Sequence, residues 1–374
     1  MAAVRIARLE AYLARVAARR DVPHIVMGVE SVDGRFRWAG ASGPAAPEGP
    51  AMTPETPYFI ASIDKLFNAI IAMTLVEQGT LDLDAPLPRY LPATLWTGLH
   101  RVGDVDRSGD VRVAHLLSHT SGLPDWLEDR PAGGASLVAR VEREGDVSMS
   151  MEEMAAYVRD RLTPHFPPQD TASPKARARY SDTNYMLLAA ILEAVTGGPL
   201  AAAHQHWLYR PLGMTRTWVE GQSRPGVDGA APAALWFGDR AMAIPGLMRS
   251  FRGVFSTVGD QVRLLRALVR GELFEQPETL GRMQHWRRFG LPRDAAALRA
   301  PNWPIEYGFG MMRFAVPRWL PPFRPAPAVV GHTGSTGTWL FHCPERDLLV
   351  AGAVDQVTAG PLPFRTLPAL LRAL

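Results

Sequence analysis

Strand-like patterns are confined to the two ends of this 374-residue chain, and helical patterns fill the length between them. Near the N-terminus, residues 24–31 and 35–38 have the pattern of two strands joined by a turn at Asp33-Gly34. Toward the C-terminus, strand patterns return at residues 311–316, 329–330, 338–343 and 348–354. Strands from opposite ends of a chain pair only if the chain folds back on itself. The sequence therefore predicts one mostly antiparallel sheet that both termini build.

Helical patterns predict what surrounds this sheet. Apolar residues recur every three or four positions from Val4 to Val16 and again from Ser62 to Gly79. Further helical patterns lie at residues 113–117, 151–162, 184–195, 204–209, 260–270 and 362–374, and no strand pattern stands out between residues 80 and 245. The expected fold class is α+β. Residues 1–61 and 246–374 form a domain with a helix-flanked sheet, residues 62–245 form a mainly helical domain, and the active site lies in the cleft between them.

Composition excludes several classes of function. The chain carries 40 Lys and Arg against 37 Asp and Glu without a run of like charge, so nucleic acid is not an expected partner. The single cysteine, Cys343, excludes an intrachain disulfide and a cysteine-rich zinc site. The sequence shows no signal segment and no apolar stretch of about 18 residues, so we expect a cytoplasmic protein that does not span a membrane. Neither a metal nor another cofactor is expected, because the pair His115 and His119 lacks further ligands, and no oligomeric state is indicated.

A serine and a lysine three residues apart begin the helical segment at residue 62. Residues three apart share a helix face, so the Lys65 amine reaches the Ser62 hydroxyl. A serine hydroxyl is a poor nucleophile until a neighbouring base takes its proton, and a buried lysine, unlike an arginine, can supply that base. The chain places one of its two lysines here, although it contains 38 arginines. The alternative is that Ser62 caps the helix while Lys65 points into solvent.

A second polar stretch, residues 180–185, precedes a helical pattern. Tyr180 and Asp182 lie two residues apart, so an extended segment directs both side chains to one side. A phenol and a carboxylate aimed at one cleft can share proton transfer and hydrogen bonding to a substrate. The alternative is a capping loop in which Asp182 holds the start of the following helix.

A third stretch, residues 331–337, is rich in glycine and lies between two strand patterns. Small residues such as Gly334 let a substrate lie against a strand edge, where backbone N–H groups can bind an oxyanion. His332 can donate to a substrate carboxylate or carbonyl, and the alternative is a glycine-rich bulge with a structural histidine. Trp126 and Trp339 are candidates for lining an apolar acyl pocket, and core packing explains them equally well.

Together the three stretches resemble one protein family. Ser-x-x-Lys at Ser62, Tyr-x-Asp at Tyr180 and His-Thr-Gly at His332 occur in the order typical of the penicillin-recognising serine hydrolases. The resemblance is to the group of class C β-lactamases, D,D-peptidases and family VIII carboxylesterases, and it covers about residues 20–355. Three further stretches also resemble this group, namely residues 116–123, 211–214 and 307–310.

The resemblance implies a role for each matching residue. It implies that Ser62 is the acylated nucleophile and that Lys65 and Tyr180 share the general-base and general-acid work. It also implies an oxyanion hole made by the backbone N–H groups of Ser62 and Ser335. The candidate substrate contacts are Asp182, His332, Thr333, Gly334, Trp126 and Trp339. The fold that it implies is a mostly antiparallel sheet flanked by helices with an all-helical lobe.

Two positions differ from the β-lactamases of this family. Asp182 stands where they usually carry Asn, and a carboxylate beside Lys65 raises the pKa of its ammonium group. That coupling moves the base role toward Tyr180, or toward a network of Lys65, Asp182 and Tyr180. His332 stands where they carry Lys, and histidine is mostly neutral at pH 7. Both differences favour an uncharged substrate over an anionic one.

We therefore predict a serine hydrolase that cleaves a carboxylic ester or a small amide through an acyl-enzyme at Ser62. One alternative is a β-lactamase or D-alanyl-D-alanine carboxypeptidase, so a lactam also remains a candidate substrate. A second is an acyltransferase that uses the same acyl-enzyme. A third is a catalytically silent binding protein on this fold, since fold alone does not fix function.

Overall fold

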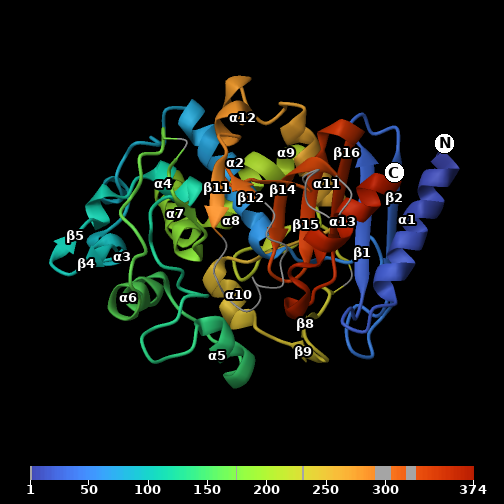
Figure 1. The fold of residues 1–374 in the computed structure, drawn as a ribbon, viewed down its shortest axis with the longest axis horizontal. Helices are drawn as coiled ribbons and strands as arrows, with labels where there is room; N and C mark the ends of the chain where they lie inside the picture. The colour runs from blue at the N-terminus through green and yellow to red at the C-terminus, as the bar shows by residue number, and fades with distance from the viewer. Residues whose placement is uncertain (1, 174, 230, 291–304, 317–325) are drawn as a thin grey trace.

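A nine-stranded sheet built from both ends of the chain is the centre of the fold (Figure 1). The computed structural model describes residues 2–173, 175–229, 231–290, 305–316 and 326–374. All neighbouring strands run antiparallel except the last pair, β11 and β6, which is parallel. The predicted antiparallel sheet is therefore confirmed. In spatial order its strands are β2 (Arg37–Ser42), β1 (Ile25–Ser31), β16 (Leu348–Ala353), β15 (Thr338–Cys343), β14 (Ala326–Gly334), β13 (Met312–Val316), β12 (Ile305–Tyr307), β11 (Arg287–Gly290) and β6 (Ala178–Arg179).

Two terminal helices cover one face of this sheet. Helices α1 (Ala2–Ala17) and α13 (Leu362–Ala373) lie side by side near the two chain ends (Figure 1). Alternate residues of β15 point toward them, so Trp339 and Cys343 are fully buried in the core between sheet and terminal helices. The candidate role of Trp339 in the acyl pocket is wrong, because its strand position directs it to this face. Core packing explains Trp339.

Two further helices, α2 (Asp64–Glu77) and α11 (Val258–Val269), pack on the opposite face of the sheet. Leu340, one residue after Trp339, belongs to this second core. The α2 helix is apolar and buried on nearly all sides, as expected for a helix that runs through the middle of a protein. The sequence predicts both helices, and it predicts that α2 ends just before Gly79. The φ of Gly79 is 68°, which lies in the left-handed region that favours glycine.

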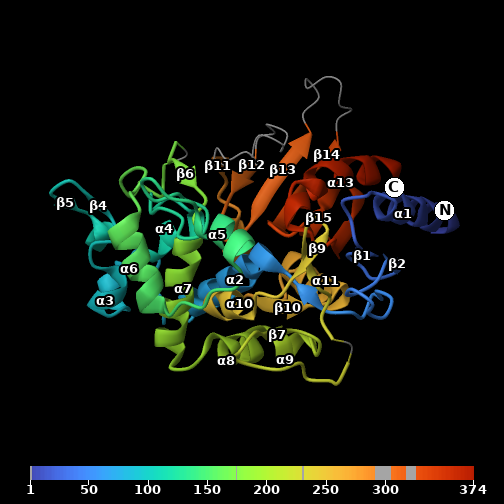
Figure 2. The same cartoon turned by 90° about the horizontal axis from the view of Figure 1, so that it is seen from below.

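The helical lobe lies to the left of the sheet in Figures 1 and 2. Its helices are α3 (Ala93–Trp96), α4 (Val113–Ser118), α5 (Leu137–Glu144), α6 (Met151–Arg161) and α7 (Asp182–Thr196). Helix α7 packs against α2 and α4, and so joins the lobe to the helices under the sheet. Within the described residues, no single helix is long and apolar enough to cross a bilayer. Only a bent pair, α7 with residues 200–212, meets the requirement, and only by length and composition.

Short strands occur between residues 80 and 245, where the sequence analysis expects none. They are β4 (Arg101–Val102), β5 (Val105–Asp106), β6, β7 (Trp218–Val219), β8 (Leu235–Phe237) and β9 (Arg240–Met242). Each has only two or three residues, too few to show an alternating pattern. Strand β7 pairs with β10 (Val254–Ser256), which also pairs with β3 (Tyr58–Phe59). Residues 62–245 therefore do not all belong to the helical lobe.

The remaining helices complete the sheet side of the molecule. Helices α8 (Leu200–His204) and α9 (Arg210–Leu212) flank a π-helical turn, Gln205–Tyr209, and lie with β7 beneath α2 and α11 (Figure 2). Helix α10 (Pro245–Phe251) leads into β10, and α12 (Glu278–Met283) leads into β11.

The end of β14 sits directly against the turn that precedes α2. That turn is a 3₁₀ helix, Ala61–Ile63, and Ala61 has a φ of 48°, a strained value for a residue other than glycine. A methyl group on Gly334 would lie 2.1 Å from the Thr338 Oγ1, 2.7 Å from the Ala61 Cβ and 2.9 Å from the Ile60 carbonyl oxygen. Strand β14 is paired on both sides, so it offers no free edge to a substrate at Gly334. A glycine stands at position 334 because a larger residue does not fit this close contact.

We predict that Gly334→Ala destabilises the protein by about 1–3 kcal/mol, because the added methyl group overpacks a contact that fixes the 61–63 turn. The matched control is Gly281→Ala in α12, where a methyl group meets no atom within 4 Å and improves helix propensity. Urea denaturation of both variants measures the difference. Equal stability of the Gly334 variant and the wild-type protein would contradict this account of the contact.

Candidate active site

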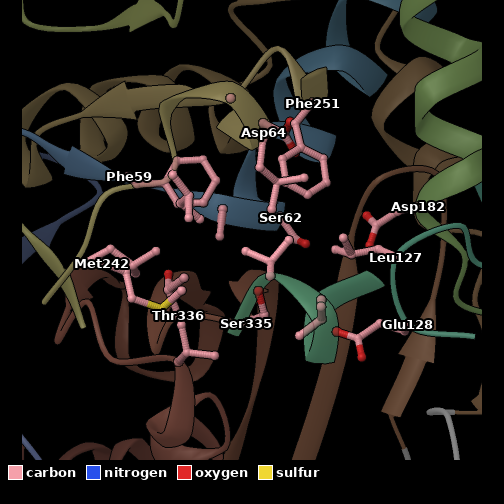
Figure 3. A pocket seen from close by; sticks show the side chains of 18 of the residues that line it. Phe59, Ser62, Asp64, Leu127, Glu128, Asp182, Met242, Phe251, Ser335 and Thr336 are labelled. Atoms are coloured by element: carbon pink, nitrogen blue, oxygen red, sulfur yellow. The ribbon is translucent and has the colours of Figure 1, made fainter. Parts of the chain in front are cut away.

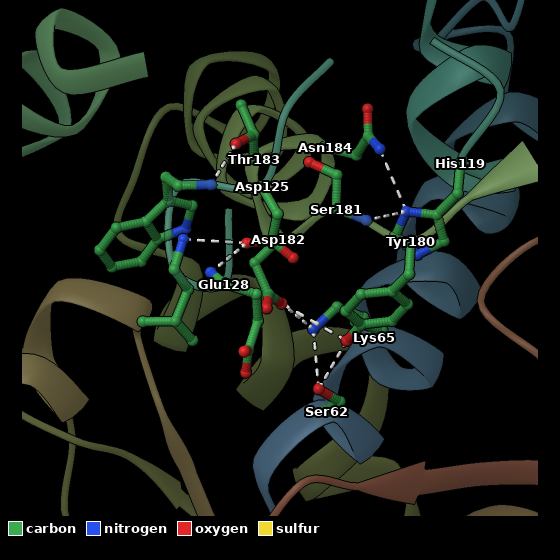
Figure 4. Close-up of polar contacts among 12 residues, drawn as sticks. Ser62, Lys65, His119, Asp125, Glu128, Tyr180, Ser181, Asp182, Thr183 and Asn184 are labelled. Carbon is green, nitrogen blue, oxygen red and sulfur yellow. Dashed lines mark hydrogen bonds and ion pairs between the residues drawn. The ribbon is translucent and has the colours of Figure 1, made fainter. Parts of the chain in front are cut away.

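Ser62 lies in the 3₁₀ turn at the start of α2, and its hydroxyl is contacted by two side chains (Figure 4). The Tyr180 hydroxyl is 2.6 Å and the Lys65 Nζ is 3.1 Å from the Ser62 Oγ. The cap of α2 is Ile63 without a side-chain hydrogen bond, and Lys65 is only 4% exposed. The alternative with a capping serine and a solvent-facing lysine is therefore wrong.

Lys65 forms a buried ion pair with Asp182. Its Nζ is 2.6 Å from the Asp182 Oδ1, across the packed helices α2 and α7. Burial lowers the pKa of Lys65, but its interactions with Asp182, Tyr180 and Asp64 outweigh this effect, so that the pKa is well above its ordinary value of 10.5. The coupling expected from the sequence is present, and Lys65 is an ammonium ion at neutral pH.

Tyr180 connects Ser62 with Asp182. It follows β6, and the extended backbone of Ser181 places the Tyr180 hydroxyl 3.4 Å from the Asp182 Oδ1, as the two-residue spacing predicts. Asp182 is the first residue of α7 and does not cap it. Burial, and then the Asp182 carboxylate, hold the pKa of Tyr180 well above 10. Tyr180 is therefore a neutral phenol that can accept a proton only while it passes its own proton on.

His119 holds the segment that carries Tyr180 and Asp182, a role that the sequence analysis misses. Its Nδ1 accepts hydrogen bonds from the Ser181 backbone N–H at 3.2 Å and from the Asn184 amide at 3.1 Å. Its ring also packs on that of Tyr180, with centroids 4.5 Å apart. Burial and the Lys65 charge lower the pKa of His119 well below 6.5, so the ring is neutral and can accept both bonds. The signal was the polar run 118–122, which the sequence analysis used for the resemblance and, at His119, for a possible metal pair, but not for this role.

Ser62 opens into a cavity that is mostly apolar (Figure 3). Together with the open solvent at its mouth, this cavity encloses about 820 Å³. Ser335 and Thr336, which follow β14, lie on the far side of the cavity from Phe59. The structure thus brings Ser335 to the same cavity as Ser62, the two residues to which the resemblance assigns the oxyanion hole. The apolar lining residues are Phe59, Ala61, Leu127, Val138, Val141, Leu235, Met242, Ile244, Leu247, Phe251 and Val357.

The structure does not bring the other residues of the glycine-rich stretch to this cavity. His332 is fully buried, and its Nε2 is 3.2 Å from the Tyr307 hydroxyl. Burial and the Lys65 charge lower the pKa of His332 to about 3, so it stays neutral. Thr333 is buried, with its hydroxyl against the Met312 sulfur. The predicted substrate contacts at His332, Thr333 and Gly334 are therefore wrong, since all three residues are buried in β14 and none of them lines the cavity.

Trp126 does not line the cavity into which Ser62 opens. It is 1% exposed and lines a separate polar cavity with Asp64, Lys65 and Asp182, and its ring packs on Phe251. The acyl pocket that it was expected to line is formed by other apolar residues, which are spread over distant segments of the chain. Among the described residues, no group of three or more His, Cys, Asp or Glu side chains has the geometry to hold a metal ion.

Asp64 is a second carboxylate beside the nucleophile that the sequence analysis does not single out. It lines both cavities, and its shielded Oδ1 accepts no hydrogen bond from the described residues. Burial raises the pKa of Asp64 to about 6, because the attraction of Lys65 only partly offsets the desolvation and Asp182 adds repulsion. This carboxyl group therefore titrates near neutral pH.

We predict that Asp64→Asn stabilises the protein, and that the gain grows between about pH 4 and pH 6. A carboxyl whose pKa is raised from 3.8 to about 6 binds its proton more tightly in the folded state, so the wild-type protein loses stability as the pH rises through this range. The gain reaches about 3 kcal/mol at pH 7. Urea denaturation at several pH values measures it. Asp239→Asn, in an exposed turn, is the control, and an Asp64→Asn gain that is the same at pH 4 and pH 7 would contradict the prediction.

Comparison with known proteins places this chain in a family. The family model named Beta-lactamase matches residues 9–372. Esterase EstB from Burkholderia gladioli is 29% identical over 330 residues, which cover 80% of this chain and 78% of that protein. The D-alanyl-D-alanine-carboxypeptidase/endopeptidase AmpH from Escherichia coli (strain K12) is 26% identical over 314 residues, which cover 81% of this chain and 71% of that protein.

Solved structures agree with the fold. The crystal structure of a D-stereospecific amidohydrolase from Streptomyces sp. superposes with a TM-score of 0.75, over 99% of this chain and 99% of that one, at 24% sequence identity. Fold similarity at this level of identity is evidence for architecture alone. Because the family model spans nearly the whole chain and the sheet and helical lobe agree with it, the protein belongs to the β-lactamase family of serine hydrolases.

Proposed function

We propose that the protein hydrolyses a carboxylic ester or a small amide through an acyl-enzyme at Ser62. One observation carries this proposal. The Ser62 Oγ lies 2.6 Å from the Tyr180 hydroxyl and 3.1 Å from the Lys65 Nζ, at the polar end of an apolar cavity. A nucleophile held beside a proton acceptor and a cation, next to room for an acyl group, fits acyl transfer.

Acylation on this geometry uses Asp182 as the final proton acceptor. As the Ser62 Oγ bonds to the substrate carbonyl carbon, its proton moves to the Tyr180 oxygen. The Tyr180 proton then moves to the Asp182 Oδ1, which is 3.4 Å away in the resting enzyme. Lys65 keeps its charge and stabilises the forming alkoxide. The reverse transfer protonates the leaving alcohol or amine, and water repeats the sequence to release the acid.

The charges around the cavity favour an uncharged reacting group. Among the described lining residues, Lys65 is the one cation, and Asp182 already neutralises its charge. His332 neither carries a charge nor reaches the cavity. A β-lactam or a peptide terminus brings a carboxylate that finds no free cation on this lining. An acyltransferase would share the acyl-enzyme and differ only in the acceptor.

We predict a covalent butyryl adduct on Ser62 after mixing with p-nitrophenyl butyrate, because this ester is uncharged and its acyl chain is apolar. Intact-mass spectrometry measures the adduct while absorbance follows nitrophenolate release. Ser62→Ala should abolish both signals, and Lys65→Ala or Tyr180→Phe should each lower the rate on the order of 100-fold.

The control for this experiment is Ser173→Ala, in the loop before β6 and away from the cavity. An adduct that persists in Ser62→Ala would assign the nucleophile to another residue. If neither an adduct nor nitrophenolate forms with the wild-type protein, the proposal fails and the silent binding protein takes its place. Adding an alcohol acceptor and measuring the new ester by mass separates acyl transfer from hydrolysis.

We predict that Asp182→Asn changes the shape of the pH–rate profile as well as its height. With Asp182 present, Lys65 keeps its proton far above neutral pH and does not act as a base. Without the carboxylate, burial lowers the pKa of Lys65, and a neutral amine forms as the pH rises. The variant should lose about 100-fold in kcat/KM at pH 7 and regain part of it toward pH 10. A variant profile parallel to that of the wild-type enzyme would contradict the coupling.

A further inference from the structure

A short β-hairpin forms one wall of the cavity beside Ser62. Strands β8 and β9 pair antiparallel, and both residues of the pair at their open end, Leu235 and Met242, line the cavity. The other two cross-strand pairs of the hairpin, residue 236 with 241 and residue 237 with 240, are not part of the described lining. Two apolar side chains that lie directly opposite each other on a hairpin form one continuous patch. The hairpin therefore presents an apolar patch of two residues to the cavity.

This patch lies on the acyl side of the nucleophile. In the mechanism proposed above, a leaving alcohol or amine takes its proton from Tyr180, which regains one from Asp182. The leaving group therefore departs on the side of Ser62 where Tyr180 and Asp182 lie. Figure 3 shows Met242 beside Thr336, on the other side of Ser62 from Asp182. The part of the substrate that stays on Ser62 as the acyl group is thus the part that extends toward the hairpin.

The hairpin is tied to the sheet through its backbone. At the turn, the Gly238 N–H donates to the Gln356 Oε1 at 3.0 Å, and the Gly238 carbonyl oxygen accepts from the Gln356 Nε2 at 2.8 Å. Next to Leu235, the Trp236 backbone N–H donates to the Asp355 carbonyl oxygen at 2.8 Å. Gln356 is fully buried, although glutamine is mostly found exposed, and a buried amide needs such partners. These bonds fix where the hairpin stands relative to the sheet.

The same two residues, Asp355 and Gln356, also hold the segment to which the resemblance assigns part of the oxyanion hole. The Gln356 backbone N–H donates to the carbonyl oxygen of Thr336, the residue after Ser335, at 2.8 Å. Asp355 has a φ of 46°, a strained value for a residue other than glycine, and its carboxylate lies 2.8 Å from the buried His24 Nε2. Strained residues persist where their surroundings fix them, and they concentrate at functional sites. Asp355 and Gln356 therefore connect the oxyanion-hole segment to the wall of the acyl pocket.

We propose that the β8–β9 hairpin makes this enzyme select an extended apolar acyl group over a short one, with Leu235 and Met242 as the contacts and Gln356 as the residue that positions them. The substrate class is esters and amides of carboxylic acids whose alkyl chain reaches the hairpin. The proposal rests on the function proposed above, because the chain extends to the hairpin while its carbonyl lies at Ser62. Each methylene group that leaves water favours binding about fourfold, so the selection adds no step to the chemistry.

Two isomeric esters test this proposal. Ethyl hexanoate and hexyl acetate have the same composition but carry the longer chain on opposite sides of the reacting carbonyl, so their ratio of kcat/KM reports which side binds that chain. Titration of the released acid at constant pH measures both rates. We expect the wild-type enzyme to prefer ethyl hexanoate by roughly tenfold, the effect of burying about two methylene groups. The ratio cancels any effect that a variant has on both esters alike.

The variants locate the preference. Met242→Gln keeps the length of the side chain and places an amide in the wall, and Gln356→Met removes both side-chain hydrogen bonds to Gly238, so each should lower the ratio several-fold. Met149→Gln makes the same change at another half-buried methionine, before α6 and outside the described cavity lining, and should leave the ratio unchanged. A wild-type ratio of one or less, or a ratio that Met242→Gln does not change, would overturn the inference. A ratio that only Gln356→Met leaves unchanged would overturn the positioning role of Gln356.

A binding measurement removes the dependence on chemistry. Ser62→Ala cannot be acylated at this position, and ligand-observed NMR titration with N-ethylhexanamide and N-ethylacetamide reports recognition alone. We expect the hexanamide to bind this variant roughly tenfold more tightly, and Met242→Gln in the same background to reduce the difference. Equal affinities would overturn the inference, and the proposed hydrolase function stands in that case if the wild-type enzyme hydrolyses both esters. Preferential binding without any hydrolysis by the wild-type protein would overturn only the proposed function.

Discussion

The ion pair between Lys65 and Asp182 is the interaction on which the rest of the site depends. Two charges removed from water carry a desolvation penalty that a single contact rarely repays. Here the pair also bonds to Ser62 and Tyr180, and it joins α2 of the sheet side to α7 of the helical lobe. The loss of either partner leaves an uncompensated charge in the core, so both charges and both helices are held in one arrangement.

The surrounding fold supplies what that arrangement needs. The close packing of Gly334 on the 61–63 turn holds Ser62 in position next to the end of β14. Strand β14 is itself paired with a strand on each side. On the lobe side, the His119 ring accepts a hydrogen bond from the backbone N–H of Ser181, the residue between Tyr180 and Asp182. The nucleophile and its proton acceptors thus come from elements that pack against each other before any substrate binds.

The sequence predicts the parts of this protein that local pattern encodes. Long strands and helices with clear periodicity, such as 338–343 and 151–162, are in place, and so are the contacts of Ser62, Lys65, Tyr180 and Asp182. Strand β6 was not predictable, because its two residues pair with a strand more than 100 positions later. Trp339 was misplaced because alternation shows that neighbours face opposite ways but not which face holds the site. His119 was missed because its role depends on a distant backbone N–H.

The two differences from the β-lactamases of the family, at Asp182 and His332, have a similar effect on the charge of the site. The Asp182 carboxylate neutralises the Lys65 ammonium group, and the buried, neutral His332 ring supplies no cation near Ser335. Each change makes the cavity less favourable for an anion. The nucleophile is unaffected by both changes, because its partners Tyr180 and Lys65 lie at 2.6 and 3.1 Å. The same acylation machinery can therefore serve substrates of different charge.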